Sequence, residues 1–360
     1  MTGLGLRRPE DASWTTWRGR RELPDTPVVV LHGGTSSERE VSLASGTAIL
    51  DALRALPEGE GPGSIRAVEI LEEGTWEVGG KPLAPHEAVS SLEPGSLFLL
   101  ALHGGAGEDG RIQAFLEVCG RRYTGSGPSA SAVCMDKRRT REAARAVGVR
   151  VAPGRLATPG AGPLYRPGEN CWFVKPNRGG SSVGVERVTD PDELQAAVER
   201  VQRTGDEALV EVEQPGLEVT SGIIGNSADE LVALPVVEVV PKQGRFFDYE
   251  EKYTDDGAEE ICPPAQLSEA SWNRVQEHAA RLYRAAGCEG YARVDFIVPP
   301  GGITGDEEPI LLEVNTLPGF TPRSILPQAA GVTGVSYSEL CLEVCARAIS
   351  RFQDHAGTRI

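Results

Sequence analysis

The chain has 360 residues and a formal net charge of −16, from 36 Lys and Arg against 52 Asp and Glu. A surface this acidic repels the phosphates of nucleic acids and of anionic lipids, so we expect neither as a main partner. The seven cysteines lack metal-finger spacing, and no apolar run approaches the roughly 18 to 20 residues of a membrane helix. Length and composition therefore predict a cytoplasmic protein of two or three domains.

Residues 1–25 show little periodicity and predict an N-terminal arm rather than a secretion signal. After the arm, Pro27 to Leu31 is an apolar run that ends in a Gly-Gly turn, which indicates a buried parallel strand. We expect Ser42 to cap the helix that follows. A second such strand, Ser96 to Leu102, also opens into a Gly-rich loop. This order predicts an α/β domain with a doubly wound parallel sheet over residues 26–126, with its ligand site above the strand ends.

The rest of the chain predicts two further units. Residues 127–211 form a small α+β unit whose expected elements are a helix, a strand, a Gly-rich hairpin loop, a second helix and a closing strand: Ser129 to Val147, Cys171 to Pro176, Arg178 to Val185, Asp190 to Val201 and Ala208 to Val212. Residues 212–360 mix three strands with two helices: Glu230 to Val240, Ala292 to Val298, Ile310 to Val314, Ser268 to Ala286 and Tyr337 to Arg351.

The strand near the C-terminus carries the most specific pattern in the sequence. Because side chains alternate along a strand, Leu312 and Val314 should point into the core while Glu313 and Asn315 point together to the other side. With Asp295 from a neighbouring strand, three oxygen ligands converge, as Mg²⁺ requires when it also holds nucleotide phosphates. A solvated acidic strand is the competing reading, but it fits poorly with so apolar a run. The pattern favours an ATP-dependent enzyme.

The Gly-rich stretch Arg178 to Gly184 allows main-chain N–H groups to approach a phosphate closely. Lys175, fixed at a strand end by the next proline, and Lys137 can each supply a positive charge to phosphate oxygens. The stretch lacks the ending of a P-loop, so on its own it could also be an ordinary turn.

Several other polar residues can reach a substrate, although each has an ordinary alternative. Glu211, Glu213 and Glu218 could accept hydrogen bonds from adenine and ribose, or be surface charges. Glu38 could meet a substrate ammonium group, or only compensate a helix N-terminus. The stretch Phe246 to Thr254 reads either as a loop folded over a site or as an edge hairpin.

Together these residues resemble the D-alanine:D-alanine ligases of the ATP-grasp superfamily, from about Val28 to about Ala348. The motifs that carry the resemblance are His32 to Leu43, Leu102 to Gly110, Tyr123 to Gly127, Met135 to Lys137, Gly180 to Gly184, Tyr249 to Tyr253, Cys262-Pro263, Arg293 to Asp295 and Glu313 to Ser324. The resemblance implies a three-domain ATP-grasp architecture with ATP bound between a central subdomain, 127–211, and a C-terminal subdomain, 212–360.

The reaction that the resemblance implies joins two D-alanine molecules for peptidoglycan synthesis. The γ-phosphoryl group of ATP is transferred to the carboxylate of the first D-alanine, and the amine of the second attacks the acyl phosphate. The resemblance also implies two Mg²⁺ or Mn²⁺ ions and a homodimer. Alternatives are a related ligase with a different second substrate, such as D-serine, and a non-catalytic nucleotide-binding regulator.

The resemblance assigns roles position by position. The metal ligands would be Asp295, Glu313 and Asn315. The ATP-binding residues would be Lys137, Lys175, Ser182, Val183, Glu211, Val212, Glu213, Gln214 and Glu218. The catalytic residues would be Glu38, Ser181, Tyr253, Arg293, Gly319 and Ser324, and His103, Lys252 and Ile325 would contact the amino-acid substrates.

The sequence departs from the family pattern at several positions: the N-terminal arm, Gly105-Ala106, Gly179, Gly222 and Arg323. These positions flank the expected site, so they bear on affinity and on the second substrate rather than on the reaction class. Tyr253 favours an amine over a hydroxyl nucleophile, because the related D-alanine:D-lactate ligases place a histidine in this loop.

Overall fold

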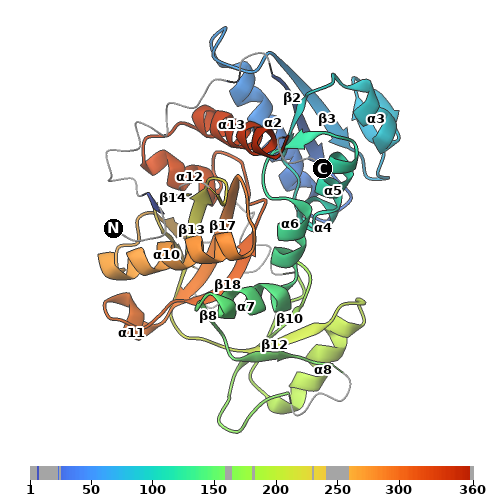
Figure 1. Cartoon of the computed structure of the whole chain (residues 1–360). Coiled ribbons are helices and arrows are strands. Elements are labelled where there is room, and N and C mark those ends of the chain that lie inside the picture. Colours follow the sequence, from blue (N-terminus) through green and yellow to red (C-terminus); the bar gives the residue numbers. More distant parts are fainter. Residues whose placement is uncertain are drawn as a thin grey trace.

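The computed structural model describes residues 6–7, 23, 26–158, 164–180, 183–228, 231–240 and 259–356. Its strands form three sheets: a six-stranded sheet at the top of Figure 1, a four-stranded sheet at the bottom, and an eight-stranded sheet between them. Among the helices in these ranges, none has the length and apolar character that crossing a membrane would need.

The six-stranded sheet has the order β5-β4-β3-β2-β6-β7. Its strands are β2 (Pro27–Gly33), β3 (Ser64–Ile70), β4 (Trp76–Val78), β5 (Lys81–Leu83), β6 (Leu97–Leu100) and β7 (Arg122–Tyr123), with helices α2 (Arg39–Arg54), α3 (Pro85–Ser91), α4 (Gly105–Glu108) and α5 (Arg111–Val118). Neighbours among β3, β2, β6 and β7 are parallel, and β4 and β5 add an antiparallel hairpin at one edge. The predicted parallel sheet is confirmed, and the hairpin is an addition.

The predicted cap of α2 is wrong. The helix begins at Arg39 with Glu38 in the cap position, so Ser42 lies one turn inside the helix. There the buried Ser42 hydroxyl accepts a hydrogen bond from the Gly33 amide at 2.8 Å and donates one to the Ala101 carbonyl at 2.6 Å. Ser42 therefore satisfies buried main-chain groups at the ends of β2 and β6, which would be costly to leave without partners.

The single helix predicted over 129–147 is two helices, α6 (Pro128–Met135) and α7 (Lys137–Ala146). The break falls at Asp136, which has an extended backbone and accepts a hydrogen bond from the Arg139 amide at 3.0 Å, as an N-cap does. Lys137 thereby becomes the first residue of α7, and its amide donates to the Asn177 carbonyl at 2.9 Å. The break thus attaches α7 to the base of the Gly-rich loop.

The four-stranded sheet has the order β11-β10-β12-β9 and is antiparallel. Its strands are β9 (Gly154–Leu156), β10 (Trp172–Pro176), β11 (Glu186–Val188) and β12 (Ala208–Val212), and helix α8 (Pro191–Gln202) packs on them. Ten buried residues form a core that belongs to this sheet and α8 alone. The predicted strands and helix are present, whereas β9 was not foreseen because it has only three residues.

The eight-stranded sheet contains the path β1-β14-β13-β17-β18-β8, and β15 joins β13 to β16. Its strands are β1 (Leu6–Arg7), β8 (Arg150–Val151), β13 (Leu217–Ile224), β14 (Leu231–Ala233), β15 (Val237–Val240), β16 (Glu259–Ile261), β17 (Tyr291–Val298) and β18 (Ile310–Asn315). The helices of this part are α10 (Glu269–Ala285), α11 (Pro300–Ile303), α12 (Ile325–Val332) and α13 (Tyr337–Ala356).

The single strand predicted over 230–240 is wrong, because β14 and β15 are separate and both pair with β13. Between them the chain leaves the sheet around Pro235, which has no N–H for a ladder hydrogen bond.

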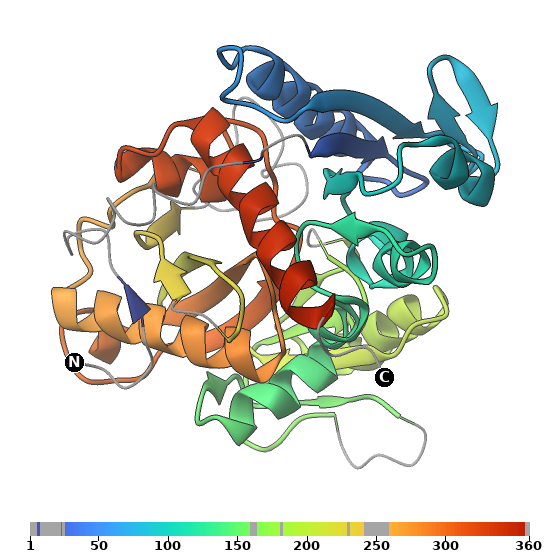
Figure 2. The ribbon, with the colours of Figure 1, turned by 45° about the horizontal axis from the view of Figure 1, so that its top comes forward.

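Helix α13 connects the eight-stranded sheet with the six-stranded sheet, and Figure 2 shows it in front of the large sheet. It packs against α2, and its buried Arg351 donates to the carbonyls of Gly125 and Tyr123. The guanidinium also lies 4.7 Å from the centre of the Tyr123 ring. The six-stranded sheet and helices α12 and α13 therefore share one hydrophobic core.

Candidate active site

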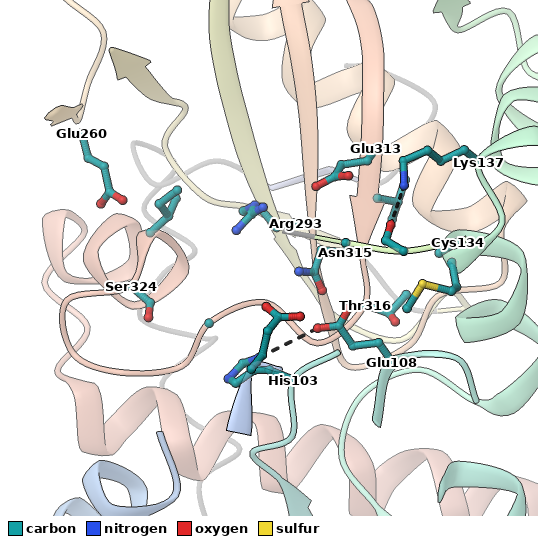
Figure 3. Close-up of a pocket in the computed structure, with 17 residues that line it drawn as sticks. His103, Glu108, Cys134, Lys137, Glu260, Arg293, Glu313, Asn315, Thr316 and Ser324 are labelled. Atoms are coloured by element: carbon teal, nitrogen blue, oxygen red, sulfur yellow. Dashed lines mark hydrogen bonds and ion pairs between the residues drawn. The ribbon is translucent and has the colours of Figure 1, made fainter. Parts of the chain in front are cut away.

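The floor of the site is one face of the antiparallel pair β17 and β18. In the register, Arg293 pairs with Asn315 and Asp295 pairs with Glu313, so four polar side chains occupy adjacent positions on one face. On the opposite face Val294 pairs with Val314, and both are buried in the core. The structure thus brings the three predicted metal ligands together with Arg293 (Figure 3).

The predicted inward orientation of Leu312 is wrong. The register shifts beside Asp295, so that Phe296 pairs with Leu311 and Leu312 has no partner on β17. An extra residue of this kind interrupts the alternation of a strand. Leu311 is buried in the core, whereas Leu312 lines a pocket together with Glu313.

Hydrogen bonds within the protein already hold Arg293, Asp295 and Asn315. Arg293 donates to the two oxygens of Asp295 at 2.9 and 2.8 Å, and Thr220 of β13 donates to the same carboxylate. Asn315 accepts from the Leu317 amide at 2.9 Å through its side-chain oxygen. These bonds fix the directions of the oxygens, and carboxylate and amide oxygens each retain further lone pairs for a cation.

The first of two adjoining pockets lies between the four-stranded sheet and β17–β18, and we call it the lysine pocket. It is lined by Lys137, Ala152, Phe173, Lys175, Pro176, Gly179, Gly180, Val183, Val185, Glu211, Val212, Glu213, Gln214, Glu218, Asp295, Ile297, Leu312 and Glu313. Every described residue predicted to bind ATP is in this set. Its apolar walls, Phe173, Ile297 and Leu312, were not predicted, although such walls suit a flat base.

The two lysines of this pocket have protein partners. The Lys175 ammonium contacts Glu211, and the Lys137 ammonium donates to the Gly179 carbonyl in the Gly-rich loop. Burial lowers the pKa of Lys137, Glu313 opposes this shift, and Lys175 adds to it. The positive charges of Lys137 and Lys175 therefore lie close enough to affect each other within the lysine pocket.

The second pocket, which we call the carboxylate pocket, lies between the loops after β2 and β6 and the same face of β17–β18. It is lined by Glu38, His103, Glu108, Cys134, Met135, Lys137, Gly179, Gly180, Glu260, Arg293, Glu313, Val314, Asn315, Thr316, Gly319, Ser324 and Ile325. Lys137, Gly179, Gly180 and Glu313 line both pockets, so the two spaces meet there.

One end of the carboxylate pocket is a cluster of Glu38, His103 and Glu108. Glu108 accepts from the Gly104 amide at 3.0 Å, and its carboxylate lies 4.0 Å from His103 Nδ1. Gly104 has a φ of +65°, and a Cβ there would lie 2.6 Å from a Glu38 oxygen, so glycine is required for the close approach. Glu38, in the loop after β2, and His103 and Glu108, which follow β6, therefore face the same end of the carboxylate pocket.

Burial keeps the pKa values of this cluster away from their ordinary range. It raises the pKa of Glu108 to about 8, with the charge of Glu38 adding to the effect. It lowers the pKa of His103 to about 4, and Arg293 adds to that shift. Near pH 7, His103 is therefore neutral, and Glu108 holds a proton in a large fraction of molecules.

The other end of the pocket is formed around the start of α12. Ser324 is the N-cap residue of α12, and a Cβ on Gly319 would lie 2.8 Å from its hydroxyl oxygen. Glu260 of β16 faces this end and accepts from Gln328 at 2.9 Å. In Figure 3 Glu260 and Ser324 lie on one side, Lys137 and Cys134 on the other, and Arg293 and Asn315 between them.

Every site residue predicted from the sequence that lies in the described ranges lines one of these two pockets. Glu108, Glu260 and Thr316 also line the carboxylate pocket but were not predicted. Glu108 had a usable signal, since it sits in the Gly-rich loop after a buried strand. Ser181, Ser182, Lys252 and Tyr253 lie outside the described residues, as does the whole stretch 246–254.

Two lysines and a Gly-rich loop face carboxylate oxygens across a pocket between an antiparallel sheet and the antiparallel strands β17 and β18 of a second, mixed sheet. This arrangement defines the ATP-grasp class of nucleotide-dependent ligases. Comparisons with known proteins agree with this class. The family model described as "D-ala D-ala ligase C-terminus" matches residues 170–345. A D-alanine–D-alanine ligase from Citrifermentans bemidjiense is 42% identical over 328 residues, which is 90% of this chain and 96% of that protein.

Solved structures give the same answer. The VanG D-Ala:D-Ser ligase from Enterococcus faecalis superposes with a TM-score of 0.75 at 28% identity, covering 90% of this chain and 100% of that one. A D-alanine–D-alanine ligase from Bacillus anthracis in complex with ATP has a TM-score of 0.73 at 28% identity, covering 92% and 99%. The chain belongs to the D-alanine–D-alanine ligase family.

Proposed function

We propose that the protein joins two D-alanine molecules at the expense of ATP, giving D-alanyl-D-alanine, ADP and phosphate for peptidoglycan synthesis. The observation that carries this proposal is the shared face of Arg293, Asp295, Glu313 and Asn315, which lies where the lysine pocket meets the carboxylate pocket. A nucleotide in one pocket and an amino acid in the other would place a phosphoryl donor beside a carboxylate. The name of the relative from C. bemidjiense favours D-alanine over D-serine as the second substrate.

The lysine pocket suits the nucleotide. Lys137 and Lys175 would contact its phosphates, together with the Gly-rich loop that includes Ser182 and Val183. The adenine amino group is a donor, so main-chain carbonyl oxygens of residues 212–214 would accept from it. Glu211 would line the base, while its two oxygens hold Arg141 and Lys175. Glu218 would hold the ribose hydroxyls.

The carboxylate pocket suits the amino acids. Glu38 would accept the ammonium group of the first D-alanine, and neutral His103 beside it adds no competing positive charge. A carboxylate is a poor electrophile, and transfer of a phosphoryl group to it creates a good leaving group. Arg293 and the Gly319 amide would stabilise the oxyanion formed when the second amine attacks.

The second D-alanine would occupy the end of the pocket at α12. Ser324 would bind its carboxylate and Ile325 would contact its methyl group. Ser181, Lys252 and Tyr253 would complete the site from segments outside the described residues.

The residues on β17 and β18 fit divalent cations. Asp295, Glu313 and Asn315 present carboxylate and amide oxygens on one face, which is the donor chemistry of Mg²⁺ and Mn²⁺. When bound, such ions neutralise charge on the phosphates. Asp295 also accepts from Arg293, so the carboxylate that would hold the ion also positions the arginine beside it.

The family resemblance further supports a homodimer in the cytoplasm and a division into an arm, 1–25, a first domain, 26–126, a central subdomain, 127–211, and a C-terminal subdomain, 212–360. Helices α6 and α7, however, pack on β18, so they would move with the C-terminal subdomain.

The test is a phosphate-release assay with Mg²⁺, ATP and one of D-alanine, D-serine, D-lactate or L-alanine, with products identified by mass. We expect phosphate and a dipeptide in equal amounts with D-alanine, and little of either with L-alanine. Absence of phosphate release with all four substrates would refute the proposal, and a dipeptide formed from D-serine but not from D-alanine would overturn D-alanine as the substrate.

A further inference from the structure

Arg141 is a buried cation behind the lysine pocket, and no step of the proposed reaction uses it. It lies on α7, and only 6% of its side chain is exposed. Burial lowers the pKa of its guanidinium, and the nearby Glu211 opposes that shift. Keeping a charged group in such a place is costly, so its contacts deserve a functional explanation.

The contacts of Arg141 lead to Lys175 through one carboxylate. Arg141 donates to one oxygen of Glu211, and the Lys175 ammonium contacts the other oxygen. The second guanidinium nitrogen donates to the Ala152 carbonyl at 2.7 Å. The side chain of Glu211 is itself only 7% exposed. Because Glu211 contacts both cations, Arg141, Glu211 and Lys175 form a row of charges from helix α7 to the lysine pocket.

The row leaves a surplus of positive charge at its pocket end. A carboxylate paired with one lysine neutralises that lysine, whereas a carboxylate shared with an arginine neutralises it only in part. Both bonds are made in a buried place, where such charge pairs act more strongly than at the surface. Arg141 therefore determines how strongly Glu211 holds Lys175.

The backbone of Gly154 packs closely against one side of Glu211. A Cβ on Gly154, its neighbour across the sheet, would lie 2.8 Å from Glu211 Cγ, so the carboxylate side chain is already tightly packed on that side. Lys137 lies four residues before Arg141 on α7, and such residues lie on the same side of a helix. One helix thus supplies a lysine to the pocket and the arginine that supports the other lysine.

We propose that Arg141 is a positioning residue for nucleotide binding: by sharing Glu211 with Lys175, it leaves the lysine charge available to the phosphates. This inference rests on the proposed function, because it is there that Lys175 contacts the phosphates. It predicts that loss of Arg141 weakens the binding of phosphates and leaves the binding of the base unchanged.

The experiment compares inhibition by ADP with inhibition by adenosine, which has no phosphates. Arg141→Met should raise the inhibition constant of ADP about 10- to 100-fold, as expected for loss of a charge-assisted interaction. The constant for adenosine should change less than about twofold, and the rate at saturating ATP less than about threefold. Lys175 remains as a partner for Glu211 in this variant, so no buried carboxylate is left alone.

Two further variants separate charge from structure. Arg141→Lys keeps the charge and should restore most of the ADP affinity. Arg145→Met removes the same charge one helical turn further on, from an exposed position, and should leave both constants unchanged. If Arg141→Met does not fold, Arg141→Gln replaces it, since glutamine can still donate to the Ala152 carbonyl.

Equal losses for ADP and adenosine, an unchanged ADP constant, or an equal effect from Arg145→Met would each overturn the inference. Failure of the proposed function is distinguishable, because it would appear in the wild-type protein as absence of dipeptide, while binding of ADP could still be measured by calorimetry.

Discussion

The lysine pocket and the carboxylate pocket share one wall but hold their charges differently. In the lysine pocket three carboxylates have close cationic partners: Glu211 contacts Lys175 and Arg141, Glu213 accepts from Arg187 at 2.7 and 2.8 Å, and Asp295 is held by Arg293. In the carboxylate pocket two acidic groups lie close enough that Glu38 raises the pKa of Glu108.

The difference matches the ligands proposed for each pocket. A polyanion such as ATP binds by exchange, because it takes over cations that protein carboxylates hold beforehand. An ammonium group enters a place where negative charge is in excess. Each pocket is thus stabilised for the charge of its own ligand, and the following predictions test whether the two can be changed independently.

The largest effect is expected at Glu313, which lines both pockets. Glu313→Gln should lower turnover at least about 100-fold, because it removes a negative charge that would hold the cation, and the cation would in turn neutralise the phosphates. Circular dichroism should show an unchanged fold. Asp306→Asn, a fully exposed carboxylate, is the control and should retain wild-type turnover. A Glu313→Gln protein with near-normal turnover would remove this residue from the shared site.

Next in size is a change confined to the carboxylate pocket. Glu38→Gln should raise the Michaelis constant of D-alanine about 10- to 100-fold, since a charge-assisted hydrogen bond to the ammonium becomes a neutral one. The Michaelis constant of ATP should stay within about twofold. Steady-state kinetics with each substrate varied in turn makes the measurement, and parallel increases in both constants would contradict the separation of the pockets.

A third prediction concerns the free energy of unfolding. Because the pKa of Glu108 rises from 4.5 to about 8 on folding, the folded protein holds this proton more tightly, and this group makes stability fall as pH rises between those values. Glu108→Gln has no proton to lose, so its free energy of unfolding should not fall in this way. As pH rises through this window, the variant should therefore gain on the order of a few kcal/mol of stability relative to wild type. Urea denaturation at pH 5.5, 7.0 and 8.5 measures the difference. Glu199→Gln, an exposed carboxylate on α8, should show no such trend, and a flat difference for Glu108→Gln would be evidence against a buried proton.

The smallest effects should come from two glycines that press on the two acidic groups. A Cβ at Gly104 would lie 2.6 Å from a Glu38 oxygen, and one at Gly154 would lie 2.7 Å from the Val210 carbonyl oxygen and 2.8 Å from Glu211 Cγ, so both acidic side chains would have to shift. Gly104→Ala should therefore raise the Michaelis constant of D-alanine, and Gly154→Ala that of ATP, each about 3- to 10-fold. Gly59→Ala and Gly61→Ala are matched controls, with a positive φ and without one, at positions where a Cβ meets no close contact. If Gly104→Ala raised the Michaelis constant of ATP, or Gly154→Ala that of D-alanine, the two pockets would be mechanically coupled.

The sequence predicted those parts of the fold that rest on continuous apolar runs. Strands β2, β6, β17 and β18 and helix α10 lie within a few residues of their expected positions. Strand β13 was missed because it carries Glu218, Thr220, Ser221 and Gly222, which do not look like the centre of a sheet. Thr220 can be buried there because its hydroxyl donates to Asp295, a contact that depends on tertiary structure.

The residues of the site that belong to short sequence motifs could be predicted. Residues on other elements that hold those residues in place, such as Arg141, could not. Arg141 sits in the run Lys-Arg-Arg-Thr-Arg, which looks like the exposed face of a basic helix, and only the fold turns it inward. The extra residue at Leu312 is likewise invisible in the sequence, because a bulge depends on how the partner strand aligns.

Helix α13 has a consequence for the order in which the protein is built. The first domain leaves the ribosome early, yet its core and the carbonyls of Tyr123 and Gly125 receive their last partners from residues near 351. Its final packing must therefore wait until almost the whole chain has been synthesised. The wall that bears Glu38 and the wall that bears Ser324 are then joined in the same late step, so no partly made chain holds a finished pocket.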